Sequence, residues 1–128
     1  DAWPWVEILT GHAGARPETV LHWLGQPIRG LVIAGTGMGG VHAAWHKPLH
    51  ALAEMGVAIA KASRVGAGHA HLNLPETDPA GWVAAGSLSA PKARIALQLA
   101  LYAAAEAKQG GKSMTWQDFF ARIAVLPE

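Results

Sequence analysis

The glycines between residues 35 and 40 form the first stretch whose residue types and spacing could do chemistry. They follow the apolar segment 31–34 (LVIA), and Gly35, Gly37 and Gly40 fit the G-x-G-x-x-G spacing of a turn that holds a dinucleotide pyrophosphate. Glycine lets the backbone approach a phosphate closely because it has no side chain. Any tight strand-to-helix turn uses the same property, so the spacing alone leaves two interpretations open.

The residues after this turn weaken the dinucleotide interpretation. Such a site uses an acidic residue about 20 positions on, at the end of the next strand. The next apolar segment, 57–62 (VAIAKA), contains no Asp or Glu, and its Lys61 would at best suit a 2′-phosphate. A strand and a helix also precede this turn, whereas the glycine-rich turn of a dinucleotide site normally follows the first strand of its βαβ unit. The sequence therefore favours a tight turn with no cofactor of its own.

Three histidines suggest a metal site at first sight. His42, His46 and His50 recur every four residues, which would place imidazoles on one face of a helix. Pro48 argues against a continuous helix, because an internal proline removes a backbone hydrogen bond and clashes with the carbonyl four residues earlier. We expect the helix to start near Pro48 and to leave His42 and His46 in the preceding loop. No carboxylate stands close in sequence, so we predict no metal site.

Other reactive side chains form no complete catalytic set. Hydroxyls are available at Thr36 and Ser63, but nothing marks a nucleophile elbow. Lys61 and Lys92 could lower each other's pKa only if the fold brought them together. Glu76 and Asp78 lie in the loop after the third strand, where they are candidates for binding polar groups of a ligand; a solvated loop is the alternative.

Composition limits the class of protein. The chain has 128 residues, enough for one domain with a sizeable core, and is 51% hydrophobic and 15% charged. Its net charge of +1 and the lack of a dense Lys or Arg run argue against nucleic-acid and membrane partners. With no cysteine there is no disulfide, thiolate metal site or cysteine nucleophile. No apolar run reaches a membrane span. The compartment, cytoplasmic or periplasmic, stays open.

Strands alternate with helices along the chain. Residues 5–9, 31–34, 57–62 and 82–85 are the four predicted strands, and unbroken apolar runs are typical of strands covered on both faces. Pro17 predicts the start of the first helix, and Gly25 and Gly56 the ends of the first two. We therefore predict an α/β fold, a small parallel sheet of about four strands with helices on both faces.

The last two helices carry the clearest end signals. Ser89 can cap a long helix with Pro91 in its first turn, and Gly110–Gly111 should stop it. Thr115 and Asp118 resemble a capping box that opens a shorter helix.

Three segments resemble the C-terminal domain of bacterial L-asparaginases. "IRGLVIAGTGMGG" resembles the family's G-I-V-x-A-G-x-G-N-G-N turn, and "VAIAKASRVGAG" its V-V-x-S-S-R-x-x-x-G strand and loop. "WVAAGSLSAPKARIALQLAL" resembles the long segment V-x-x-G-x-L-N-P-x-K-A-R-x-x-L-x-L-A-L. The matches keep the family's order and spacing and cover most of residues 28–101. The resemblance implies a Rossmann-like C-terminal domain spanning 1–128, with the N-terminal catalytic domain, of roughly 200 residues, outside this chain.

The resemblance also implies a function and a site. The full-length parent would hydrolyse L-asparagine to L-aspartate and ammonia as a homo-oligomer, a dimer or tetramer, with no metal and no organic cofactor. The glycine loop would reach the neighbouring subunit's substrate pocket through Met38, Gly39 and Gly40; Met38 and Gly40 replace the family's two asparagines. Glu76 is the nearest match to a glutamate that reaches the substrate's amino group. No catalytic residue lies in this chain by this interpretation.

Two other functions compete with the amidohydrolase. The chain could be a non-catalytic binding or interaction domain of the same fold, which the loss of the asparagine at Gly40 would suit. It could also be a Rossmann-type nucleotide module, although a protein without the acidic residue should show weak or no protection by NAD(P) in thermal melts. The chain starts at Asp1 rather than Met, and we expect a domain to precede it.

Overall fold

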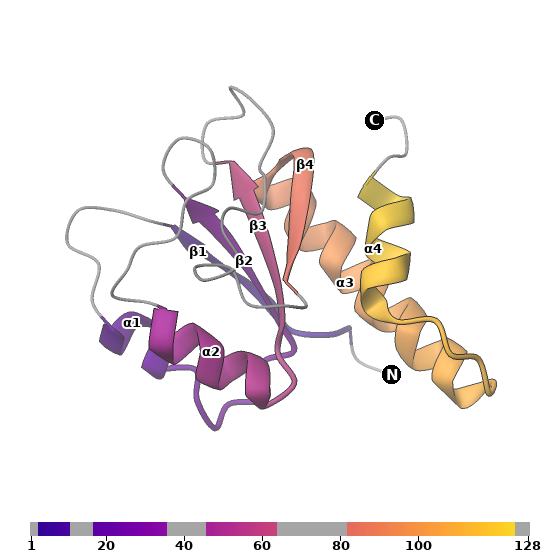
Figure 1. Cartoon of the computed structure of the whole chain (residues 1–128), viewed down its shortest axis with the longest axis horizontal. Helices are drawn as coiled ribbons and strands as arrows, with labels where there is room; N and C mark the ends of the chain where they lie inside the picture. The colour runs from indigo at the N-terminus through magenta and orange to yellow at the C-terminus, as the bar shows by residue number, and fades with distance from the viewer. Residues whose placement is uncertain (1–2, 11–16, 36–45, 64–81, 125–128) are drawn as a thin grey trace.

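The fold is a parallel β-sheet with helices on both faces, as predicted (Figure 1). The computed structural model describes residues 3–10, 17–35, 46–63 and 82–124. Four parallel strands lie in the order β1-β2-β3-β4. The strands are β1 (Val6–Thr10), β2 (Gly30–Gly35), β3 (Ala58–Ser63) and β4 (Val83–Ser89). The helices are α1 (Pro17–Leu21), α2 (His46–Glu54), α3 (Ala90–Gln109) and α4 (Trp116–Ala124).

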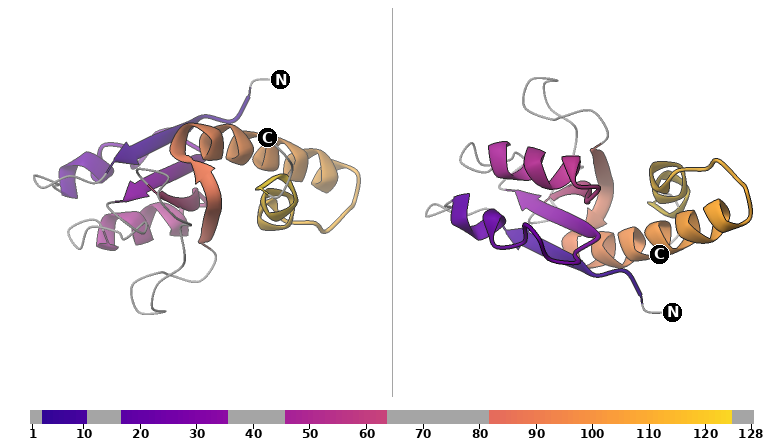
Figure 2. Two further views of the ribbon diagram at one scale, coloured as in Figure 1. Left: turned by 90° about the horizontal axis from the view of Figure 1, so that it is seen from above. Right: turned by 90° about the horizontal axis from the view of Figure 1, so that it is seen from below.

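The alternation of side chains along the central strands divides the core into two layers. In β2, Leu31 and Ile33 pack with α1 and α2, while Val32 and Ala34 pack with α3. All four side chains are buried, which explains why the strand is an unbroken apolar run. Figure 2 shows α3 on one side of the sheet and α1 and α2 on the other.

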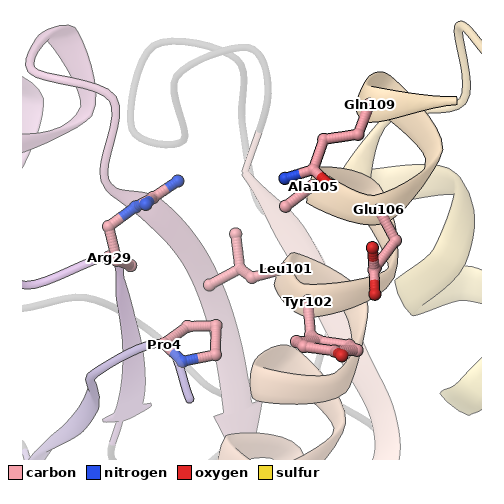
Figure 3. Close-up of a pocket in the computed structure, with 7 residues that line it drawn as sticks. All are labelled: Pro4, Arg29, Leu101, Tyr102, Ala105, Glu106 and Gln109. Atoms are coloured by element: carbon pink, nitrogen blue, oxygen red, sulfur yellow. The ribbon is translucent and has the colours of Figure 1, made fainter. Parts of the chain in front are cut away.

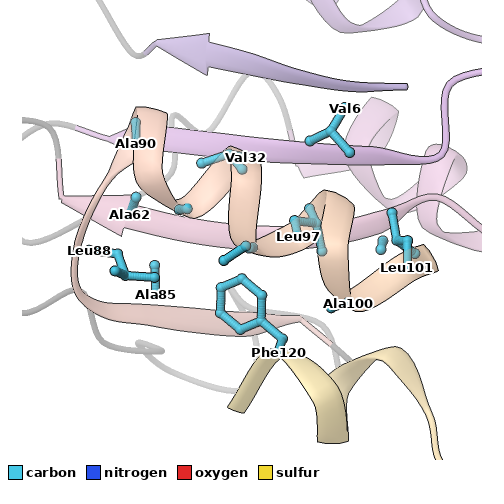
Figure 4. Packing of buried hydrophobic residues seen from close by; sticks show 14 of the residues in the cluster. Val6, Val32, Ala62, Ala85, Leu88, Ala90, Leu97, Ala100, Leu101 and Phe120 are labelled. Atoms are coloured by element: carbon cyan, nitrogen blue, oxygen red, sulfur yellow. The ribbon is translucent and has the colours of Figure 1, made fainter. Parts of the chain in front are cut away.

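Small residues allow α3 to lie close to the sheet. Its inner face presents Ala93, Ala96 and Ala100, all buried, to the alanines of β3 (Figure 4). At Gly30, a Cβ would lie 2.9 Å from Leu97 Cδ2, so only glycine fits under the helix without displacing its neighbours. Phe120 of α4 enters the same cluster and closes it from the side.

The predicted end signals of the last two helices are confirmed. The Ser89 hydroxyl accepts a hydrogen bond from the Lys92 backbone N–H at 3.4 Å, and α3 ends before Gly110. Thr115 and Asp118 form the predicted capping box, because the Asp118 carboxylate accepts from the Thr115 N–H at 3.1 Å and the Thr115 hydroxyl accepts from the Asp118 N–H at 3.3 Å.

Two predicted boundaries were wrong. Helix α2 begins at His46, two residues before Pro48, so His46 belongs to the helix and not to the preceding loop. Proline is tolerated there because the N–H groups of a first turn have no partner within the helix. Strand β4 runs to Ser89 instead of ending at Ala85, since the strand leads directly into α3.

Glycines in the left-handed conformation follow the two shorter helices. Gly25 has φ of +82° and Gly56 has φ of +95°, both in the left-handed region that favours glycine. A third predicted boundary, the end of the first helix near Gly25, was also wrong: α1 ends at Leu21, and turns occupy the residues between it and Gly25. The end of α2 near Gly56 is confirmed, since that helix ends at Glu54.

Candidate functional site

The carboxyl edge of the sheet is where a parallel α/β fold places function. Strands β1, β2 and β3 end at Thr10, Gly35 and Ser63, and the loops 11–16, 36–45 and 64–81 start from these points. Gly35 and Ser63 are direct partners in the β2–β3 register. The strands that precede the glycine segment and the segment with Glu76 therefore end side by side (Figure 1).

The predicted site residues themselves lie outside the described residues. Met38, Gly39 and Gly40 belong to the loop after β2, and Glu76 belongs to the loop after β3. The structure thus describes the strand ends that precede these residues in the chain, and the assignment of the residues stays a prediction.

Lys61 is the buried charged residue among those described, with a side chain 0% exposed. It lies two residues before the end of β3, next to Ile33 in the register, and alternation along the strand places it on the face covered by α1 and α2. A buried ammonium needs partners, and Lys61 has an interaction within the chain. Lys92 is exposed on α3, on the other side of the sheet, so the fold does not pair the two lysines.

The described residues offer no metal site. Among them, no group of three or more His, Asp or Glu side chains could hold a metal ion. His50 is exposed on α2, His46 starts that helix, and His42 lies outside the described part of the chain.

The strand order argues against a dinucleotide crevice. In doubly wound sheets the ligand binds where the strand order reverses, because the loops diverge there. The four described strands follow one another without reversal, and β2 lies between β1 and β3. The glycine turn after β2 therefore does not open at such a switch point.

A second feature lies toward the opposite edge of the sheet and was missed by sequence reasoning. An open pocket of about 130 Å³ is formed where the segment before β1, the residue before β2 and the C-terminal half of α3 meet (Figure 3). Its lining residues are Pro4, Arg29, Leu101, Tyr102, Ala105, Glu106 and Gln109.

Side-chain contacts hold this region together. The Gln98 side chain donates a hydrogen bond from Nε2 to the Pro4 carbonyl oxygen at 3.1 Å and so ties the N-terminal segment to α3. The Trp3 ring then lies against the Tyr102 ring, with centroids 5.1 Å apart. The Glu106 carboxylate, through a hydrogen bond with the Tyr102 hydroxyl and its negative charge, raises the pKa of Tyr102 above its ordinary value of 10.0.

The sequence carries only part of the signal for this surface. Ile95, Leu99, Tyr102 and Glu106 follow the spacing i, i+4, i+7 and i+11, which places them on one stripe of a helix. Because apolar residues also occupy the other faces of this helix, the stripe cannot be told from the buried face without knowing which side of α3 meets the sheet.

Comparisons with known proteins agree on one family. Residues 5–114 match the family described as Glutaminase/Asparaginase C-terminal domain. "Probable L-asparaginase periplasmic" of Haemophilus influenzae is 36% identical over 102 residues, which are 79% of this chain and 29% of that protein. "Glutaminase-asparaginase" of Acinetobacter glutaminasificans is 33% identical over 114 residues, 85% of this chain and 34% of that protein.

A solved structure gives the same result for the fold. The crystal structure of a probable cytoplasmic L-asparaginase from Campylobacter jejuni superposes with a TM-score of 0.76 at 26% identity, over 94% of this chain and 35% of that one. The chain therefore spans about a third of the length of these relatives. None of the described helices is long and apolar enough to cross a membrane.

Proposed function

This chain belongs to the glutaminase/asparaginase C-terminal domain family, and from that premise we propose that it is the C-terminal domain of an amidohydrolase that converts L-asparagine to L-aspartate and ammonia. The family match over residues 5–114 carries the proposal. The names of the relatives support the substrate class, a linear amide.

The chemistry of the parent divides between domains in this proposal. A threonine alkoxide outside these 128 residues attacks the side-chain amide carbon and forms a tetrahedral intermediate. Its C–N bond then breaks, the nitrogen takes up a proton and leaves as ammonia, and an acyl-enzyme ester remains. Oxyanion-hole donors stabilise the tetrahedral intermediate, and water then releases aspartate. The present chain supplies subunit contacts and part of the neighbouring subunit's substrate pocket, and it uses no metal or organic cofactor.

The substrate-binding residues we propose are Met38, Gly39, Gly40 and Glu76, acting in trans. The shared register of Gly35 and Ser63 supports this assignment, because it starts both loops at neighbouring points of one sheet edge. The loop backbone would close the pocket, while the Glu76 carboxylate would receive the substrate's ammonium group.

A domain exchange tests the proposed function. The 114 matched residues of the Acinetobacter protein would be replaced by their counterparts from this chain, and ammonia release from asparagine and glutamine would be measured. We expect measurable release from the exchanged protein and none from the 128-residue chain alone. A folded, inactive exchanged protein, or release from the isolated chain at a rate proportional to its concentration, would contradict the proposal.

Two substitutions in the exchanged protein test the site residues. A hydrogen bond to a charged ligand is worth roughly 1.5–3 kcal/mol, so Gly40→Asn should lower KM for asparagine about tenfold or more. Glu76→Ala should raise KM by a similar factor. Unchanged KM in both variants would remove these residues from the pocket and leave the family assignment intact.

A further inference from the structure

The outer face of α3 carries large apolar side chains where an ordinary surface helix carries polar ones. Trp3 is 58% exposed, Ile95 52%, Leu99 40% and Tyr102 39%. The buried residues of α3, including Ala93, Leu97 and Ala100, lie on the opposite side of the helix, against the sheet. The apolar stripe is therefore not part of the core, and a contiguous exposed apolar patch marks an interaction surface.

The stripe is held in a defined shape. The hydrogen bond from Gln98 to Pro4 keeps the N-terminal segment along the helix, and the Trp3 ring lies against Tyr102. The hydrogen bond between Tyr102 and Glu106 fixes the phenol at the end of the stripe. Fixed aromatic side chains contribute strongly to protein interfaces, because little conformational entropy is lost when they are covered.

The charges at the two ends of the stripe identify the partner. Lys92 and Glu106 stand seven residues before and seven residues after Leu99, and both are exposed. If a second α3 packs antiparallel with a two-fold axis at Leu99, each Lys92 meets the other copy's Glu106. An ammonium has three donors, so Lys92 can do this in addition to its interaction within the chain.

The same axis matches the apolar groups. In that arrangement Leu99 would meet its own counterpart, and Ile95 of one copy would lie near the Trp3 and Tyr102 rings of the other. Such a contact is isologous, since one patch serves both subunits. We propose that the outer face of α3, formed by Trp3, Lys92, Ile95, Leu99, Tyr102 and Glu106, is a two-fold interface with a second copy of this chain. The inference rests on the proposed function, in which this chain supplies subunit contacts, and it gives those contacts a location.

Sedimentation of the 128-residue chain at tens of micromolar tests the location. We expect a dimer for the wild type and a monomer for Leu99→Glu, whose Kd should rise more than roughly a hundredfold because two carboxylates meet at the axis. Met55→Glu is the matched control: Met55 is 59% exposed and lies after α2, so this variant should remain dimeric. Circular dichroism would verify that both variants are folded.

A cross-link tests the axis itself. The chain contains no cysteine, so Leu99→Cys introduces a single thiol. A short bismaleimide should couple two copies of Leu99→Cys efficiently and two copies of Met55→Cys poorly.

Charge exchange tests the antiparallel pairing. Lys92→Glu and Glu106→Lys, each alone, should weaken the dimer by roughly threefold to tenfold, as expected for exposed ion pairs made twice. The double variant should recover wild-type affinity. A helix packed in parallel, or a different partner on this face, would give no recovery.

The outcomes separate this inference from the proposal on which it rests. A monomeric wild-type chain would overturn the self-association and the interface together. A dimer that Leu99→Glu leaves intact would overturn only the interface on α3. A dimer broken by Leu99→Glu but not coupled through Leu99→Cys would overturn the two-fold axis at this residue.

Discussion

The two faces of the sheet are filled in different ways. On the face covered by α3, most of the buried side chains are alanines, which pack with a few valines and leucines, and Phe120 is the fully buried aromatic ring of that described cluster. On the face covered by α1 and α2, the contacts come from large aliphatic side chains, among them Leu31, Leu49 and Leu52. The helices differ as well, since α3 spans 20 residues with a capped start whereas α1 and α2 span 5 and 9.

This difference separates two sources of stability. On the α3 face, stability depends on the close approach of the helix to the sheet. An enlarged side chain there should therefore lower the free energy of unfolding more than an exchange between side chains of similar volume. The α1/α2 face depends on the bulk of its side chains, and its short helices depend on that packing because isolated helices of this length are not stable. The buried ammonium of Lys61 lies on this second face, close to the edge with the candidate site.

Removing the large ring from the α3 face should have the largest effect on stability. Phe120 is 1% exposed and joins α4 to the alanine cluster. Phe120→Ala should lower the free energy of unfolding by about 3–5 kcal/mol, because it leaves a cavity that the alanines cannot fill. Urea unfolding measures the change. Phe119→Ala is the comparison within α4, because the Phe119 side chain is only partly buried against the same cluster and should cost less. A loss for Phe120→Ala no larger than that for Phe119→Ala would show that the Phe120 ring does not join α4 to the core.

Enlarging a helix alanine should reveal the close approach. Ala100→Leu should cost about 1–3 kcal/mol, because Ala100 is fully buried against the sheet. Ala105→Leu, on an exposed position of the same helix, is the matched control and should change stability little. On the other face, Leu49→Ile should cost less than about 1.5 kcal/mol. The contrast between the faces fails if Ala100→Leu is as well tolerated as Ala105→Leu.

Loss of the capping box should have a smaller effect. Thr115→Ala removes the hydroxyl that accepts from the Asp118 N–H and should lower the free energy of unfolding by about 1 kcal/mol. Thr115→Ser keeps the hydroxyl and should retain most of the stability. Thermal unfolding of the two variants gives the comparison, and equal losses would mean that the methyl group and not the cap is responsible.

The smallest effect concerns the outer surface of α3. Because Glu106 raises the pKa of Tyr102, the phenol should ionise above pH 10.0. The contact between Tyr102 and Glu106 should therefore stabilise the fold below that pH, and this stabilisation should be lost as the pH rises through the raised pKa. Tyr102 is the chain's one tyrosine, so tyrosinate absorbance reports it directly.

Glu106→Gln should return the pKa of Tyr102 toward its ordinary value, since the negative charge is removed. Glu18→Gln on α1, on the other side of the sheet, is the control and should leave the titration unchanged. A wild-type titration at the ordinary value would contradict the contact between Tyr102 and Glu106.

The sequence by itself determined the fold class and most element ends, because these depend on neighbouring residues. Apolar runs define the strands, and Ser89, Gly56 and the Thr115–Asp118 box act within one turn of the chain. It failed at His46, where one proline was read as the start of the helix although two residues of the first turn precede it.

Only the tertiary structure decided which surfaces face the core and which groups meet. The outer stripe of α3 and its buried face both carry apolar residues in the sequence. One face is buried and the other exposed only because the sheet covers one of them. The apposition of Gly35 with Ser63 and the burial of Lys61 likewise arise from strand register. Register joins residues far apart in the chain, and a periodic pattern along one segment carries no information about its distance from another.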